Sequence, residues 1–310
     1  MKRCALGLLC LGAVSLLSGC VGVGDWDADA YKEEFHSSRP LQPGGRVTVE
    51  TFNGSVEVAG WEQDSVEING TKHAGSRSTL EDIKIDINGD PSSLRIRAVR
   101  PSDGLRSAGV HFSIRVPRKA VLELVSSSNG RIELESVDGN ARLRTSNGRI
   151  RISRLGGNLE AETSNGTIEA HEVHGNVKLH TSNGTIRADA RGGGFEATTS
   201  NGRIEVRLQD PSSEPVRLRS SNGHIELAID AKELPEVRAF TNNSSILLRV
   251  PAMSNARVRA YTSHASVSSD FPELHSDRDR KPSEMDGSIG RGGPLLELET
   301  SNGPIQIEKL

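Results

Sequence analysis

Hydrophobic and polar residues alternate along most of the chain in short segments instead of recurring at helical spacing. One such segment follows a glycine, as in residues 149–152 (RIRI), and a second precedes a threonine, as in residues 159–162 (LEAE). An alternation with a period of two is typical of β-strands with one buried face. The pattern therefore predicts an all-β protein with almost no helix.

The two segments recur together as one repeated unit, which is marked by the tripeptide Ser-Asn-Gly. Steps of 18 residues separate its first five copies, at Asn129, Asn147, Asn165, Asn183 and Asn201. Steps of 21 residues lead on to Asn222, Asn243 and His264, and the last two of these stand in altered copies. A final intact copy lies at Asn302. Repeats of this length predict a stack of small structural units.

Two arrangements of these units compete. Asn-Gly between strands favours tight antiparallel hairpins and hence a meander. Equivalent positions, however, alternate in charge from unit to unit, as in the column Glu133, Arg151, Glu169, Arg187 and Glu205. Opposite charges stabilise a sheet only when they are direct neighbours, as in parallel strands about 4.8 Å apart. We therefore expect a parallel β-solenoid (β-helix) of 18–21-residue two-strand coils, with an irregular N-terminal β cap.

The asparagine and glycine of each turn predict a sharp corner. Both residues tolerate the left-handed backbone region, so we expect them to adopt it there. Stacked asparagine side chains can also form hydrogen bonds from coil to coil, as a ladder along the axis. We interpret these asparagines as structural and not as a ligand site.

The N-terminus predicts an exported, lipid-anchored protein. Lys2 and Arg3 precede an apolar stretch, residues 6–17, that is too short to span a bilayer. It ends in Leu-Ser-Gly-Cys at residues 17–20, which resembles the bacterial lipobox, whose cysteine is lipidated when the leader is removed. The alternative is an ordinary secretory signal with a chance cysteine. We expect a lipoprotein signal peptide over 1–19 and lipidation of Cys20.

The rest of the chain divides by its repeat pattern. Residues 20–44 lack a clear period and are expected to form a lipid-anchored tether. Residues 45–126 contain strand patterns with longer connections and are expected to cap the stack, with Trp61 and Phe112 in the cap core. Residues 127–310 are expected to form the Ser-Asn-Gly repeats, with an inserted polar loop at about 269–294.

The composition limits which residue types can form the core and which classes of partner the chain can bind. Aromatic residues are only 3% of the 310 residues, so we expect an aliphatic core and no aromatic-lined sugar or base platform. A formal net charge of -3 gives no basic footprint for nucleic acid. Of the 3 cysteines, only Cys20 remains once the leader is lost, so no disulfide can form within a monomer.

Several motifs together resemble a known family. They are Gly60-Trp61 after an initial Asn-Gly strand pair, an Ile-x-Val-Pro strand ending at Pro117, Leu122-Glu123-Leu124, and serial Thr-Ser-Asn-Gly-x-Ile units. Over roughly residues 45–310 the chain resembles the bacterial putative-adhesin family of β-strand-repeat lipoproteins (domain of unknown function 4097). The resemblance implies a repeat fold and an envelope location, and it brings no catalytic residues. The altered copies at Asn243 and His264 depart from the family pattern.

Candidate chemistry is sparse. His171, His174 and nearby His180 suggest a metal site, but they lack the helical spacing of zinc-protease motifs, and surface histidines are the better interpretation. No nucleophile elbow, phosphate loop or dinucleotide fingerprint occurs in the sequence. The acidic residues are spread in alternation with arginines and are not clustered. We therefore expect no catalytic residues, no cofactor and no metal site, and we do not expect an enzyme.

These observations predict a non-catalytic, lipid-anchored scaffold or adhesin-like interaction protein of the cell envelope. Val21 and Gly22, where an aspartate would signal retention, favour the outer membrane in a two-membrane host. The expected partners are the membrane, through the lipid anchor, and an unknown envelope protein or an extended polysaccharide. A regulatory or sensory envelope lipoprotein with a protein partner is the first alternative. A polysaccharide-acting β-helix enzyme is the second.

Overall fold

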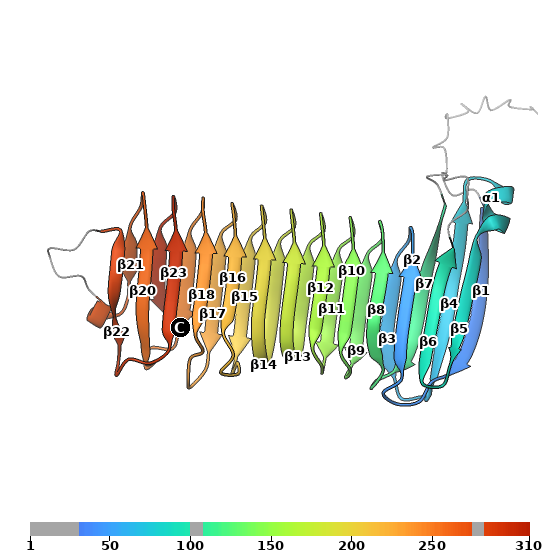
Figure 1. Ribbon diagram of the computed structural model, residues 1–310, viewed down its shortest axis with the longest axis horizontal. Helices are drawn as coiled ribbons and strands as arrows, with labels where there is room; N and C mark the ends of the chain where they lie inside the picture. The colour runs from blue at the N-terminus through green and yellow to red at the C-terminus, as the bar shows by residue number, and fades with distance from the viewer. Residues whose placement is uncertain (1–30, 100–107, 275–281) are drawn as a thin grey trace, which may run out of the picture.

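The computed structural model describes residues 31–99, 108–274 and 282–310. The expected signal peptide and Cys20 lie outside the described residues. Within them the protein is all-β, with 24 strands in one hydrogen-bonded sheet. Helical structure in these residues is limited to α1 (Arg77–Asp82), whose N-terminus is capped by Ser76, and the 3-10 turn η1 (Pro272–Leu274). Figure 1 shows the strands side by side in one long row, with α1 at the end that holds β1.

The strands form two rows that run the length of the molecule. In the pre-turn row, most strands end at the turn threonine or serine. Its spatial order is β5 (Lys84–Asp90), β6 (Ser93–Val99), β2 (Arg46–Thr51), β8 (Val121–Ser127), β10 (Ala141–Thr145), β12 (Leu159–Thr163), the second halves of β13 (Ile168–Thr181) and β14 (Ile186–Thr199), β16 (Val216–Ser220), β18 (Val237–Thr241), β23 (Leu295–Thr300), β20 (Ala256–Thr262) and β22 (Glu284–Ile289).

The post-turn row holds the strands that follow the turn glycine, together with the antiparallel strands of the N-terminal end. Its spatial order is β1 (Tyr31–Pro40), β4 (Ser65–Ala74), β7 (Gly109–Pro117), β3 (Val56–Trp61), β9 (Ile132–Val137), β11 (Ile150–Leu155), the first halves of β13 and β14, β15 (Ile204–Gln209), β17 (Ile225–Asp230), β19 (Ile246–Val250), β24 (Ile305–Lys309) and β21 (Val267–Ser269).

Strand pairing within the repeats is parallel and in register. Ile150 pairs with Ile132 on one side and with Ile168 on the other, each at the equivalent position of the neighbouring unit. The adjacent outward position pairs Arg151 with Glu133 and Glu169. The charge column read from the sequence is therefore a column of real neighbours, and the antiparallel meander does not occur in these repeats. The inward residues of both rows are mainly Ile, Val, Leu and Ala and belong to one buried cluster.

The turn threonine forms buried hydrogen bonds between coils and within its own turn. Thr163 is 1% exposed; its hydroxyl donates to the carbonyl of Gly148 in the preceding coil (3.1 Å) and accepts from the amide of Gly166 in its own turn (3.2 Å). Glycine follows because a Cβ on Gly166 would overlap the carbonyl oxygen of Gly148. The repeated turn therefore needs a hydroxyl side chain at the position of Thr163 and a glycine at the position of Gly166.

The predicted asparagine ladder is present. From Asn129 onward, each turn asparagine donates its side-chain amide to the side-chain oxygen of the turn asparagine in the neighbouring coil, at 2.6 to 2.7 Å, and Asn53 accepts at the end of the ladder. The ladder runs, in spatial order, through Asn53, Asn129, Asn147, Asn165, Asn183, Asn201, Asn222, Asn243 and Asn302.

The left-handed backbone expected at this turn lies mainly elsewhere. Among the turn glycines of the described repeats, Gly54 has a positive φ (121°), whereas the turn asparagines have none. At the ends of β9, β11 and the first half of β13, a column of non-glycine residues adopts it instead: Ser136, Arg154 and Glu172, with φ of 59°, 58° and 54°. This bulge shifts the alternation by one residue, so that the following Val137, Leu155 and Val173 are buried.

The C-terminal coil does not follow the order of the sequence. β23 pairs with β18 on one side and with β20 on the other, and β24 likewise lies between β19 and β21. Figure 1 shows β23 in this place, between β18 and β20. The last unit of the chain therefore fills a space inside the stack, and the altered unit with His264 forms the outer end.

The expected polar insertion, 269–294, contains ordered structure. Its described part includes η1 and β22, and β22 pairs antiparallel with β20 at the end of the pre-turn row. Phe271 and Leu274 are buried, at 1% and 3% exposure. These two apolar side chains cover the end of the core. The segment expected as a polar loop is therefore partly a structured cover.

At the N-terminal end, as at the C-terminal end, the spatial order of the strands differs from their order in the sequence. The first coil, β2 and β3, lies between β6 and β7 on one side and β8 and β9 on the other. Antiparallel β4 and β1 extend the post-turn row, and antiparallel β5 extends the pre-turn row. Residues 31–40, expected as part of the tether, thus form strand β1. The ring of Phe35 on this strand packs edge-on against the ring of Phe112, with 6.0 Å between their centroids.

Candidate functional site

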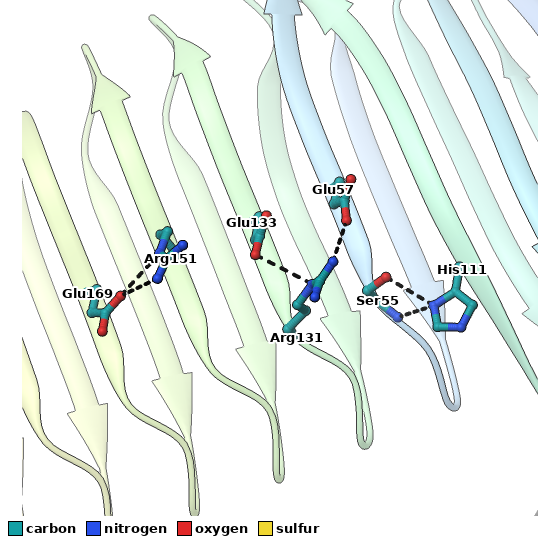
Figure 2. Close-up of polar contacts among 7 residues, drawn as sticks. All are labelled: Ser55, Glu57, His111, Arg131, Glu133, Arg151 and Glu169. Carbon is teal, nitrogen blue, oxygen red and sulfur yellow. Dashed lines mark hydrogen bonds and ion pairs between the residues drawn. The ribbon is translucent and has the colours of Figure 1, made fainter.

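Paired charges cover the outward columns of both strand rows. Figure 2 shows Arg151 of β11 on Glu169 of β13, where the guanidinium and carboxylate are 3.1 Å apart, at one coil's spacing. On the pre-turn row Arg142 lies 2.8 Å from Glu160, and Lys178 lies 4.0 Å from Glu196. Such exposed pairs contribute about 0.2–1 kcal/mol each. The paired charges cancel one another, and the carboxylates are spread along the columns instead of clustered.

Some ion pairs join more than two side chains. Arg131 lies between Glu57 at 2.9 Å and Glu133 at 3.4 Å (Figure 2), and the hydrogen bond that it donates to Glu57 raises the pKa of Arg131. Desolvation raises the pKa of Glu205, but hydrogen bonds from Arg203 and Arg187 outweigh it and leave that pKa below its ordinary value. Both groups therefore keep their charge at neutral pH.

A serine and a histidine lie close together in the N-terminal part. Figure 2 shows the Ser55 hydroxyl and backbone amide both directed at Nδ1 of His111, each at 3.0 Å. Nucleophilic catalysis needs the histidine nitrogen as a base for the hydroxyl proton. Here the backbone amide of Ser55 already donates to that nitrogen, so the contact fixes the turn after Gly54. This pair was not anticipated from the sequence, since Ser55 and His111 are far apart along the chain.

The histidines singled out in the sequence do not converge. His171 lies on the outward side of the post-turn row, where its Nδ1 is 2.8 Å from Asp189. His180 lies in the pre-turn row, with Glu162 and Thr198 as register partners. His174 stands at the corner beside Gly175, where its register partner is Arg191. Within the described residues, no group of three or more His, Cys, Asp or Glu side chains could hold a metal ion.

Of the two aromatic residues expected in the cap core, Phe112 is fully buried and Trp61 is not. Phe112 is buried, at 1% exposure, as predicted for the cap core. Trp61 is half-buried; its indole nitrogen donates to the carbonyl of Ser65 at 2.8 Å, and Arg115 lies 5.8 Å from its ring. Two further aromatics, half-buried Phe240 and 45%-exposed Tyr261, stand at outward positions of β18 and β20. Their outward place follows from the period-two alternation of those strands.

A long groove follows the start of the pre-turn strands. It has a volume of about 1040 Å³ and extends from β6 and β2 to β16. Charged side chains of both signs line it at successive coils: the basic Arg95, Arg142, Lys178 and Arg217, and the acidic Glu50, Glu123, Glu160, Glu196 and Glu214. Because the groove is open, shallow and lined by repeating positions, it fits an extended molecule better than a compact substrate. No helix in the part of the chain described here has the length and apolarity needed to cross a membrane.

No family model matches the sequence, and no curated protein matches it. Several solved bacterial structures do match, each with 10% identity over 90% of this chain. A putative adhesin from Parabacteroides distasonis is covered over 97% of its length with a TM-score of 0.41, and one from Bacteroides fragilis over 97% with a TM-score of 0.37. A putative cell adhesion protein from Clostridium sporogenes is covered over 100% with a TM-score of 0.21.

Proposed function

We propose that the protein is a non-catalytic, adhesin-like interaction module of the cell envelope, built as a parallel β-solenoid and anchored to the outer membrane through lipidated Cys20. The long groove carries this proposal, because it repeats the same outward positions over successive coils. A surface of this kind binds an extended polymer or protein through many weak contacts, whose combined affinity far exceeds that of each one.

The contacts within the groove support a binding role over a catalytic one. Its acids, such as Glu160 and Glu196, are held by basic residues of the neighbouring coil. General acid–base catalysis needs a carboxyl group placed to exchange a proton with the substrate. A carboxylate that is ion-paired and open to solvent is poorly suited to that task.

The proposed function can be tested by retention. Full-length protein is added to envelope-bearing cells and to isolated extracellular matrix, and the bound fraction is measured with detergent-matched bovine serum albumin as control. Saturable retention on cells or matrix supports the adhesin-like role. Capture of a single stoichiometric protein partner, without such retention, would instead favour the regulatory lipoprotein, and turnover of an acidic glycan would favour the enzyme.

The anchor has its own test. Metabolic labelling with a clickable palmitate analogue should label the protein and not the Cys20→Ser variant. The labelled protein should fractionate with the outer membrane of a two-membrane host. Equal labelling of the two chains would contradict lipidation at Cys20.

A further inference from the structure

The charge alternation of the pre-turn row fails at one step between neighbouring coils. Arg217 of β16 pairs in register with Arg238 of β18, so two positive side chains stand directly side by side. At the preceding steps of the same column, the register partners are Arg142 with Glu160 and Lys178 with Glu196. Like charges on neighbouring strands destabilise a sheet.

The same step on the post-turn row also places like charges together, but these are compensated. Glu205 and Glu226 are register partners. Glu205 is ion-paired with Arg187 and Arg203, both within 3.0 Å, and Glu226 is held by Arg249. Arg238 likewise reaches Glu236 at 2.7 Å. Arg217, by contrast, has no ion pair among the residues that the structure describes, although Glu196 is its register partner in the preceding coil.

A second arginine and an aromatic ring stand beside it. Arg219 lies two residues along β16, and its guanidinium is 5.1 Å from the centre of the Phe240 ring on β18. Arg219 also has no carboxylate partner within the described part of the chain, and both Arg217 and Arg219 are exposed. The cation–π contact holds the guanidinium against the ring and leaves its N–H groups at the edge able to bind an acceptor.

The long groove reaches these residues at Arg217, whereas Arg219, Arg238 and Phe240 lie outside its lining. Arg217 lines its last coil, and the groove continues from there past Lys178 and Arg142 towards β2 and β6. A polymer bound at the cluster therefore has a continuous path along the row. The cluster of Arg217, Arg219, Arg238 and Phe240 is called the arginine cluster below.

We propose that the arginine cluster is the anchoring site for an acidic polysaccharide, which then lies along the groove. Guanidinium groups match carboxylates and sulfates through paired hydrogen bonds, and the Phe240 ring holds the guanidinium of Arg219 in place for such a contact. A nucleic acid would offer phosphates to the same guanidinium groups, and the test below distinguishes the two polymers. This inference rests on the proposed interaction function and names the chemistry of its ligand.

The test measures binding of sodium polygalacturonate to full-length protein by isothermal titration calorimetry in detergent. Arg217→Gln should weaken the affinity about tenfold, because a charge-assisted bidentate contact is lost. Phe240→Leu, which keeps the apolar character, should weaken it about threefold because the cation–π contact that positions Arg219 is lost. Arg151→Gln, on the other row, removes the same charge and should leave the affinity unchanged. Neutral dextran should not bind.

Thermal stability provides the readout that separates binding from folding. Because Arg217→Gln removes one of two adjacent positive charges, its melting temperature should equal or exceed that of the original protein while its affinity falls. Equal affinity of Arg217→Gln and the original protein would overturn the proposal. So would an equal loss in Arg151→Gln, which would mean attraction by net charge alone, or tighter binding of a DNA duplex than of polygalacturonate. If polygalacturonate fails to bind but retention on cells persists, this inference fails and the proposed function stands.

Discussion

The turn threonine joins two successive coils through one hydroxyl group. In the Thr163 turn, that hydroxyl satisfies a carbonyl of the preceding coil and an amide of its own turn. The same contacts recur at Thr145, Thr181 and Thr199. Serine replaces threonine at Ser127 and Ser220 with equivalent hydrogen bonds to the turn glycines. At the residue scale the hydroxyl, more than the methyl, is what the turn requires.

Substitution of this hydroxyl should open the turn. Thr163→Val keeps the shape of the side chain but leaves a buried carbonyl and a buried amide without a partner, at a cost of about 1–3 kcal/mol. Hydrogen exchange of the Gly166 amide should therefore become faster. Thr163→Ser retains both hydrogen bonds and is the matched control. Equal exchange in the valine and serine variants would show that the hydroxyl is not essential.

Acid should weaken the stack at Glu205. The pKa of Glu205 is lower in the folded protein than its ordinary value of 4.5, so its stabilising effect is fully present above that value. This effect is lost as the pH falls through the lowered folded pKa. Glu205→Gln should therefore make the free energy of unfolding less dependent on pH below about 4.5. An unchanged slope in urea unfolding series over that range would argue against the effect.

At the scale of the strand, neighbouring units are held by register as well as by hydrogen bonds. Each outward side chain lies beside its equivalent in the next coil. A column of alternating charge therefore stabilises the native register, whereas a column of like charges would destabilise it. Arg151 is flanked in this way by Glu133 and Glu169. The pairs are individually weak, but a slip of one residue would bury every one of these charges.

Exchange of one charge pair tests this register. Arg151→Glu places a glutamate between Glu133 and Glu169 and should cost about 1 kcal/mol of stability. The double variant Arg151→Glu with Glu169→Arg should recover part of that loss in urea unfolding, although the new arginine then meets Arg187. Losses that simply add would mean that the two positions are not neighbours.

Much of the repeat region could be predicted from the sequence because equivalent positions are also spatial neighbours. The isoleucine column, the charge column and the asparagine ladder all follow from that single fact. The role of Thr163 was missed because its hydrogen bonds require the exact distance between two coils. The left-handed backbone was assigned to the Asn-Gly turn, but the close stacking of Gly166 on Gly148, and not its φ, requires glycine there.

At the scale of the whole molecule, spatial order departs from sequence order at both ends. A sequence pattern specifies which residue types fit on the two sides of a coil. It does not specify which coil of the chain lies there. One signal was available: the intact asparagine at Asn302 follows two altered copies. An inner coil needs an asparagine to extend the ladder, whereas the outer coil with His264 needs none. The C-terminal strand β24 is thereby paired on two sides, which should limit its fraying, whereas β1 at the other end of the described residues pairs with β4 alone.

Distances between spin labels on the outer face of the pre-turn row test the parallel stack most directly. Arg144, Arg219, Glu299 and Tyr261 occupy equivalent positions in β10, β16, β23 and β20. Pairs of cysteines at these positions, with the native cysteines changed to serine, can be labelled and measured by double electron–electron resonance.

The account predicts that distances from position 144 increase by about 4.8 Å per coil, to about 19 Å at position 219, 29 Å at position 299 and 34 Å at position 261. Position 299 should therefore lie nearer than position 261, although it comes later in the chain. An increase of about 9.6 Å per unit, as a meander requires, or position 261 nearer than position 299, would contradict the account.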